Sequence, residues 1–199
     1  MTPNNKKNIT SISVNINGRE IPGFEGETVL DVAKRADIEI PTLCHDDRLD
    51  PSGCCRMCLV EVEGQRRLQP ACAWKATDGQ VVTTETTRIE RHRTALTSLY
   101  MADHDSTELH SLAPNNILKQ QAKAFGATHI HPINSPRETR QEINPYIHFD
   151  PDLCILCARC VHYCDEVEGV SAITLVNRGA ETTISTANSI GLLDSDCEL

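Results

Sequence analysis

Aromatic residues are scarce in this chain of 199 residues, which contains three Phe, three Tyr and one Trp. Because aromatic side chains bury the most apolar area, small domains built from this sequence need other sources of stability. Basic residues are also outnumbered, since 19 Lys and Arg against 28 Asp and Glu give a net charge of −9. That sign opposes binding to a phosphate backbone, so no nucleic-acid partner is expected.

Two kinds of apolar segment are missing as well. No stretch approaches the length of a membrane-spanning helix, so we expect membrane association only through a partner. The first residues, MTPNNKKNIT, are polar and lack the apolar core of a secretory signal, which predicts a reducing, cytoplasmic location. Ten cysteines are nevertheless present, and their C-x-x-C runs favour metal or cluster ligation over disulfides.

Hydrophobic periodicity and turn residues predict a mixed chain of strands and helices. The elements expected in the first part are a β-hairpin over 10–22 that turns at Asn17-Gly18, a helix over 29–36 capped by Thr28, a polar loop over 41–57, and strands over 58–64 and 80–84. Those expected later are helices over 86–103 and 117–126, the second ended by Gly126, a connector over 127–146, and a strand–turn–strand within 170–186. The first group predicts a β-grasp arrangement.

Four cysteines of the first part follow the spacing C-x10-C-x2-C-x13-C, and they are Cys44, Cys55, Cys58 and Cys72. Four thiolates can enclose two irons and two bridging sulfides. The turn at Asp50-Pro51, with Ser52 and Gly53 after it, lets the backbone curl closely and direct N–H groups at the sulfurs. A structural zinc site uses the same donors and stays open as the alternative.

The stretch PTLCHDDRLDPSGCCRMCLVEVEG, continued by PACAWKATDGQVV, resembles a known [2Fe–2S] domain. This domain is found in the large iron–sulfur subunit of NADH:quinone oxidoreductase (complex I), in the α subunit of NAD-dependent formate dehydrogenase, and in subunits of NAD-linked hydrogenases. The resemblance implies a [2Fe–2S] cluster on Cys44, Cys55, Cys58 and Cys72. Cys54 occupies a variable position of the pattern and is interpreted as a non-ligand.

The relatives continue with an H-x3-C-x2-C-x5-C motif that holds a histidine-ligated [4Fe–4S] cluster. This chain has LYMADH, with His104 in place, but the following DSTELHSLAPNN contains no cysteine. We therefore expect that cluster to be absent, and His104 and His110 to be ordinary surface residues. A metal trio of His92, His104 and His110 is the alternative that we favour less.

A second constellation, CILCARCVHYC, follows the C-x2-C-x2-C-x3-C spacing of bacterial ferredoxins with Cys154, Cys157, Cys160 and Cys164. In two-cluster ferredoxins the fourth cysteine serves the other cluster. Cys154, Cys157 and Cys160 are therefore expected to hold one [4Fe–4S] cluster, whose fourth ligand, Cys164 or a partner residue, stays open. Cys164 and Cys197 could be the remnant of a second site. The relatives continue beyond DSDCEL with more cysteines, so we expect an incomplete domain, which could also take zinc.

The sequence thus predicts an α+β chain in four parts. They are a [2Fe–2S] β-grasp domain over 8–85, a helical segment over 86–126 that corresponds to the degenerate His/Cys cluster domain, a linker over 127–145, and a truncated, bacterial-ferredoxin-like [4Fe–4S] domain over 146–199. No nucleophile–base pair and no G-x-G-x-x-G fingerprint is present, so no catalytic residue is expected.

These features predict an electron-transfer subunit or module rather than a catalyst. The resemblance implies a flavin/NAD-binding subunit as one partner, and a molybdenum or tungsten formate dehydrogenase, a hydrogenase or a complex I subunit as the other. The protein would set the binding and the potential of its clusters, while the clusters carry the redox chemistry. A zinc- or cluster-containing adaptor without electron transfer, or a fragment of a longer catalytic subunit, is the alternative.

Overall fold

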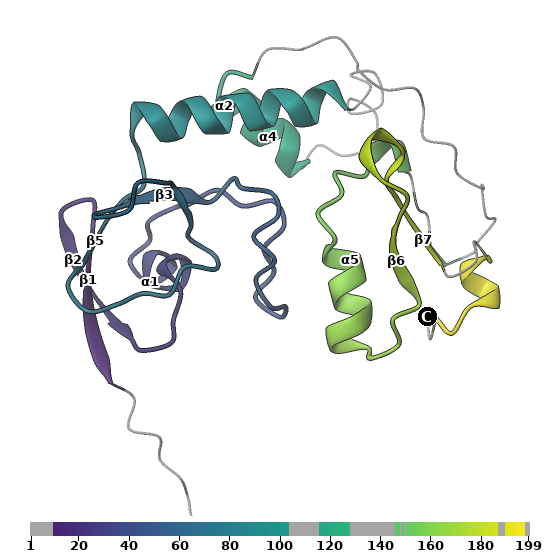
Figure 1. Cartoon of the computed structure of the whole chain (residues 1–199), viewed down its shortest axis with the longest axis horizontal. Helices are drawn as coiled ribbons and strands as arrows, with labels where there is room; N and C mark the ends of the chain where they lie inside the picture. Colours follow the sequence, from purple (N-terminus) through teal and green to yellow (C-terminus); the bar gives the residue numbers. More distant parts are fainter. Residues whose placement is uncertain are drawn as a thin grey trace, which may run out of the picture. The chain divides into compact units, whose positions relative to one another are not determined.

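The computed structural model describes residues 10–103, 116–127, 146–147, 149, 151–186 and 190–197. The chain divides into two compact units, and Figure 1 labels its helices and strands. The first unit comprises Met1–Thr42 and Arg56–His92, and the second unit comprises Leu43–Cys55 and Arg93–Leu199. Among the helices that these described residues form, none combines the length and the hydropathy that crossing a membrane requires.

The sheet of the first unit begins with the predicted hairpin. Strand β1 (Ser11–Ile16) pairs antiparallel with β2 (Arg19–Phe24). Asn17 and Gly18 join them with φ values of 54° and 81°, the two positive angles that a type I′ turn requires. The hairpin prediction is confirmed, and β2 extends two residues further than expected.

Helix α1 (Val29–Arg35) is the predicted capped helix. The Thr28 side chain accepts a hydrogen bond from the Asp31 amide at 3.2 Å, while the Asp31 carboxylate accepts one from the Thr28 amide at 2.8 Å. This reciprocal pair satisfies amides that the first turn of a helix otherwise leaves unpaired. The helix ends near its prediction, at Arg35.

Three further strands complete the sheet, and they are β3 (Leu59–Val62), β4 (Gln69–Pro70) and β5 (Gln80–Thr83). The strand order is β2-β1-β5-β3-β4, with β1 and β5 parallel and the other pairs antiparallel. Strands from the two ends of the unit therefore lie side by side at its centre, with α1 in the connection between hairpin and returning strands. This topology confirms the β-grasp prediction, although the two-residue β4 was not expected.

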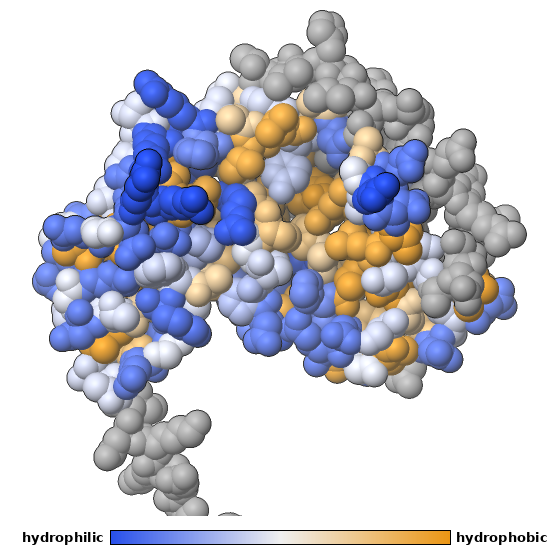
Figure 2. Space-filling model, in the orientation of Figure 1, coloured by the Kyte–Doolittle hydropathy of each residue, from blue (hydrophilic) through white to orange (hydrophobic). Residues whose placement is uncertain are grey.

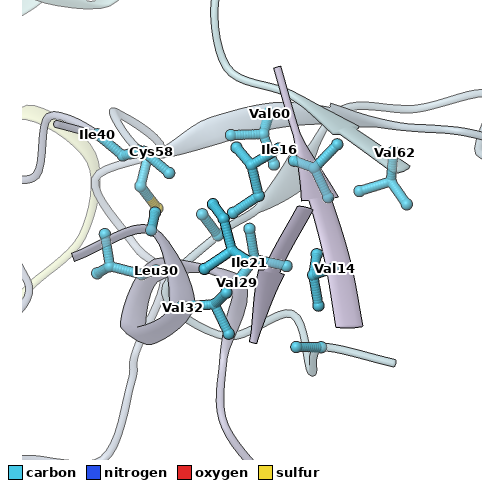
Figure 3. Packing of buried hydrophobic residues seen from close by; sticks show 14 of the residues in the cluster. Val14, Ile16, Ile21, Val29, Leu30, Val32, Ile40, Cys58, Val60 and Val62 are labelled. Atoms are coloured by element: carbon cyan, nitrogen blue, oxygen red, sulfur yellow. The ribbon is translucent and has the colours of Figure 1, made fainter. Parts of the chain in front are cut away.

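Alternating residues of the strands face the buried side of α1 and form one apolar core (Figure 3). Val14, Ile16, Val29, Val32 and Val60 are completely buried. Cys58 lies within the same cluster of core residues. The packing of the core therefore fixes the position of Cys58, one of the predicted ligands.

Helix α2 (Thr87–Ala102) begins in the first unit and continues into the second. The Thr86 hydroxyl accepts a hydrogen bond from the Ile89 amide at 3.2 Å, as expected of a cap. Helix α4 (Ile117–Ala124) follows, and Gly126 after it has a φ of 60°. Both predicted helices are confirmed. The linker 127–145 lies almost entirely outside the described residues, and so do His104 and His110.

The C-terminal segment, residues 151–197, consists of short elements. They are η1 (Pro151–Leu153), α5 (Arg159–His162), the π-helix η2 (Tyr163–Val167), β6 (Ile173–Val176), η3 (Gly179–Glu181), β7 (Thr183–Thr186) and η5 (Leu192–Asp194). Strands β6 and β7 form an antiparallel pair, which confirms the strand–turn–strand prediction. Hydrophobic residues lie open on the surface of the second unit (Figure 2), and Val167, Leu175 and Leu193 are exposed.

Candidate metal centres

The first cysteine loop contains no helix or strand between Arg35 and Leu59, as predicted. Its backbone enters the left-handed region at Gly53, with a φ of 60°, and at Arg56, with a φ of 57°. A residue with a Cβ atom adopts this conformation only where its surroundings hold it there. The turn at Arg56 lies inside the C-x-x-C sequence, so the strain is placed between two predicted ligands.

Cys58 and Cys72 lie together in the first unit, and their Sγ atoms are 3.4 Å apart. Each residue is 1% exposed. Backbone pairing positions them, because the Ala71 amide donates to the Cys58 carbonyl at 3.0 Å. Two thiolates on one tetrahedral ion, with metal–sulfur bonds of about 2.3 Å, lie about 3.8 Å apart. The pair therefore has the spacing of two ligands that share one metal ion.

Cys44 and Cys55 form the corresponding pair in the second unit. The Cys55 amide donates to the Cys44 Sγ at 3.5 Å, and both residues are buried. Hydrogen bonds from the Cys54 and Cys55 side chains hold the pKa of Cys44 far below its ordinary value, while the contact with Cys44 raises the pKa of Cys54. These donors stabilise the thiolate form of Cys44, which is the metal-binding form of cysteine.

None of the ten cysteines, all within the described residues, forms a disulfide. In the same part of the chain, no three His, Cys, Asp or Glu side chains are arranged to hold a metal ion. A structural zinc ion needs four donors around one centre, whereas two bridged irons need two pairs of thiolates. Each buried pair supplies the two thiolates that one iron of such a cluster needs. Of the three histidines considered as a possible metal trio, only His92 lies within the described residues, and it is exposed on α2.

The second cysteine run is curled by two left-handed residues, Leu156 with a φ of 54° and Ala158 with a φ of 59°. The Leu156 amide donates to the Cys154 Sγ at 3.4 Å. The surrounding protein desolvates the Cys160 thiol, which raises its pKa, and electrostatic interactions with the nearby Cys157 and Cys154 raise it further. The three predicted [4Fe–4S] ligands are therefore neighbours, and backbone amides within the run face sulfur.

Cys164 and Cys197 differ in their surroundings. Cys164 lies in the π-helix η2, where its Sγ accepts a hydrogen bond from the Ala172 amide at 3.2 Å. π-Helical turns occur frequently at functional sites. Cys197 is half-buried after η5, and its amide donates to the Ser195 Oγ at 3.3 Å. The role of either cysteine as a cluster ligand stays a prediction.

Tyr100 on α2 is a site neighbour that the sequence analysis missed. Burial raises the pKa of its hydroxyl, and electrostatic interactions with Cys55, Cys54, Cys44 and Cys157 raise it further. The phenol therefore stays neutral beside thiols of both cysteine segments. A tyrosine within a helical pattern carries no signal for this role, because only the fold brings it to the cysteines.

Comparison with known families matches two parts of the chain. Residues 10–87 match the family described as a 2Fe-2S iron-sulfur cluster binding domain. Residues 144–197 match the NADH-quinone oxidoreductase subunit 3, ferredoxin-like domain. The first match contains Cys44, Cys55, Cys58 and Cys72, and the second contains all five C-terminal cysteines.

Similar proteins are subunits of larger oxidoreductases. The chain is 38% identical over 178 residues to a subunit of the NADH-quinone oxidoreductase of Rhizobium meliloti, covering 87% of this chain and 21% of the relative. It is 33% identical over 196 residues to a subunit of the NADP-reducing hydrogenase of Solidesulfovibrio fructosivorans, covering 95% and 34%. The chain thus spans between about a fifth and a third of these relatives' lengths.

A solved structure agrees with these matches. A chain in the crystal structure of an NAD+-reducing [NiFe]-hydrogenase superposes with a TM-score of 0.75 at 27% identity, covering 93% of this chain and 82% of that one. The predicted fold class, with a [2Fe–2S] and a [4Fe–4S] ferredoxin-like domain, is confirmed. The two matched domains and these relatives together match the family of the complex I large iron–sulfur subunit, to which the chain is similar over the matched residues.

Proposed function

We propose that this chain conducts single electrons through two iron–sulfur clusters, as one part of a larger oxidoreductase. The observation that carries the proposal is the cysteine pairing. Two buried pairs, Cys44 with Cys55 and Cys58 with Cys72, lie within the matched [2Fe–2S] domain. Each pair fits one iron of a two-iron cluster. When bound, such a cluster accepts and releases one electron at a time.

The protein residues contribute binding, burial and hydrogen bonds. The buried cysteines exclude water from the sulfurs, and the Cys55 amide donates to the Cys44 Sγ. Such a bond stabilises the more negative, reduced state and so raises the potential. For the [4Fe–4S] cluster we propose Cys154, Cys157 and Cys160 as ligands, with Cys164 or a residue of a partner as the fourth.

The relatives support a proposal for the partners. Their names describe NADH-quinone oxidoreductase and NADP-reducing hydrogenase subunits. We therefore propose a flavin/NAD-binding subunit on one side of the electron path, and a hydrogenase, complex I or formate dehydrogenase subunit on the other. We further propose the four-part division 8–85, 86–126, 127–145 and 146–199 for the chain. In it, the [2Fe–2S] domain ends where α2 begins.

The test is metal analysis and electron paramagnetic resonance of the anaerobically purified chain. We expect brown protein with about six iron and six acid-labile sulfide per chain, the sum of a [2Fe–2S] and a [4Fe–4S] cluster. Colourless protein loaded with zinc would support the adaptor instead. Cys55→Ser and Cys58→Ser should each abolish the [2Fe–2S] signal of the reduced protein. Cys54→Ser is the matched control and should keep it, and the reverse pattern would refute the ligand assignment.

A further inference from the structure

Cys54 is a cysteine of the first loop that the proposed ligand set does not use. It is exposed, whereas its neighbour Cys55 is 2% exposed. Its Sγ lies 3.4 Å from the carbonyl oxygen of Cys157, a residue 103 positions away and a proposed [4Fe–4S] ligand. The Ser52 Oγ lies 3.5 Å from the same sulfur. The Cys54 thiol therefore reaches from the first loop to the backbone of the second cysteine run.

The same thiol also contacts the first ligand set. The Cys54 side chain hydrogen-bonds to Cys44, a proposed [2Fe–2S] ligand. The Cys54 sulfur thus lies within hydrogen-bonding reach of two residues that are proposed ligands, Cys44 and Cys157. The resulting chain of contacts runs from one ligand residue to the other through one side chain.

Other contacts within the second unit hold the first loop against the C-terminal segment. The Asp50 amide donates to the Glu166 Oε2 at 2.7 Å. The Arg48 guanidinium lies 4.9 Å from the centre of the Tyr163 ring, within the range of a cation–π contact. The Glu166 carboxylate also contacts the His162 ring at 2.8 Å. The contacts of Asp50 and Arg48 therefore hold the first loop beside the C-terminal segment, in addition to the contact between Cys54 and Cys157.

We propose that Cys54 is a positioning residue for electron exchange between the two clusters, linking the ligand Cys44 to the backbone of the ligand Cys157. This inference rests on the proposed function. When both clusters are bound, they would supply the one-electron chemistry, and Cys54 would connect their ligand segments without itself being oxidised or reduced. A donor to the Cys44 sulfur stabilises the reduced [2Fe–2S] state. The contacts of Cys54 also connect the two ligand segments directly, through one side chain.

The test compares Cys54→Ala and Cys54→Ser in the full chain carrying both clusters, with Ser11→Ala, at the exposed first residue of β1, as control. Both potentials are measured by redox titration followed by electron paramagnetic resonance, and the exchange rate is measured after flash reduction. We expect Cys54→Ala to keep both clusters and to shift their exchange equilibrium about fivefold away from a reduced [2Fe–2S] cluster, the effect of losing one hydrogen bond. Exchange should also slow.

Cys54→Ser keeps a donor on a shorter side chain and should restore part of both effects, while Ser11→Ala should change neither. Unchanged potentials and rate in Cys54→Ala would overturn the proposal. Loss of the [2Fe–2S] signal in both Cys54 variants would make Cys54 a ligand and would overturn it as well. Failure of the proposed function looks different, because the unsubstituted chain would then lack iron and sulfide.

Discussion

The first unit and the C-terminal segment 151–197 both contain proposed cluster ligands, but they are stabilised in different ways. The first unit has an apolar core of buried strand and helix residues, with Val14, Ile16 and Val60 completely buried. Among the described residues of the C-terminal segment, the buried apolar residues are Ala158 at 9% and Ile184 at 8% exposed. A segment with so little core needs another source of stability.

Their helices show the same difference. Helix α1 begins at Thr28 with a reciprocal capping box. Helix α5 has four residues, begins after Ala158 in the left-handed conformation, and has no side-chain hydrogen bond at its cap. The start of α1 in the first unit is therefore fixed by side chains of the helix itself and its cap. In the C-terminal segment, we infer that bonds between cysteines and iron replace the missing core, as they do in other small metal-binding domains.

Removal of the clusters should separate the two regions most strongly. After chelation of iron under reducing conditions, we expect the amides of β6 and β7 to lose at least about 100-fold in protection from hydrogen exchange, because metal binding and folding are coupled there. Amides of β1 and β5 should keep most of their protection, since the apolar core remains. Hydrogen exchange with mass spectrometry measures both. Equal losses in the two regions would contradict the comparison.

Truncation of a core residue should affect only the first unit. Ile16→Ala removes a fully buried side chain and should lower the free energy of unfolding of that unit by about 3 kcal/mol. The single tryptophan, Trp74, packs against this core and reports its unfolding in urea by fluorescence.

The matched control for this truncation is Leu175→Ala on β6, where Leu175 is 42% exposed. The Leu175→Ala substitution should change the free energy of unfolding by no more than about 0.5 kcal/mol. A large effect at Leu175, or none at Ile16, would show that apolar burial is not what distinguishes the regions.

Local signals explain why the first unit was predictable. The turn between β1 and β2 requires two positive φ angles, which Asn17 and Gly18 tolerate. The Thr28 cap likewise acts locally, within one turn of α1. The ligand cysteines were recognisable from their spacing. Which cysteine lies beside which was not, because the contact between Cys58 and Cys72 depends on the backbone pairing next to β4.

The C-terminal segment was less predictable for a physical reason. Its curl depends on left-handed backbone at Leu156 and Ala158, residues whose side chains give no hint of that conformation. The π-helix at Tyr163–Val167 is likewise set by its surroundings. The contact of Cys54 with Cys157 joins residues 103 positions apart and was beyond any pattern in the sequence.

Removal of the α1 cap should have a smaller effect than removal of core. Thr28→Ala deletes the oxygen that accepts the Asp31 amide and should lower the stability of the first unit by about 1 kcal/mol. Thr28→Ser keeps that oxygen and should retain most of the stability. Urea unfolding followed at Trp74 measures both variants. A loss of similar size in the C-terminal segment would show that the two regions unfold as one.

The smallest effect should come from Glu20 on the exposed side of the hairpin. Its carboxylate accepts hydrogen bonds from the Ser13 hydroxyl at 2.6 Å and the Asn15 amide group at 3.0 Å. These two hydrogen bonds lower the pKa of Glu20 from its ordinary value of 4.5, and the bond from Ser13 has the larger effect. A lowered pKa in the folded state means that the contribution is present above pH 4.5 and is lost as the pH falls through the folded value.

Glu20→Gln should therefore lower the urea midpoint of the first unit slightly at pH 7, and the difference from the unsubstituted chain should shrink as the pH falls below 4.5. Because acid releases sulfide from clusters, the comparison uses cluster-free protein, in which the core is expected to keep the first unit folded. Trp74 fluorescence again provides the signal. A difference that grew toward acid pH would require a raised pKa for Glu20, which these two donors to its carboxylate oppose.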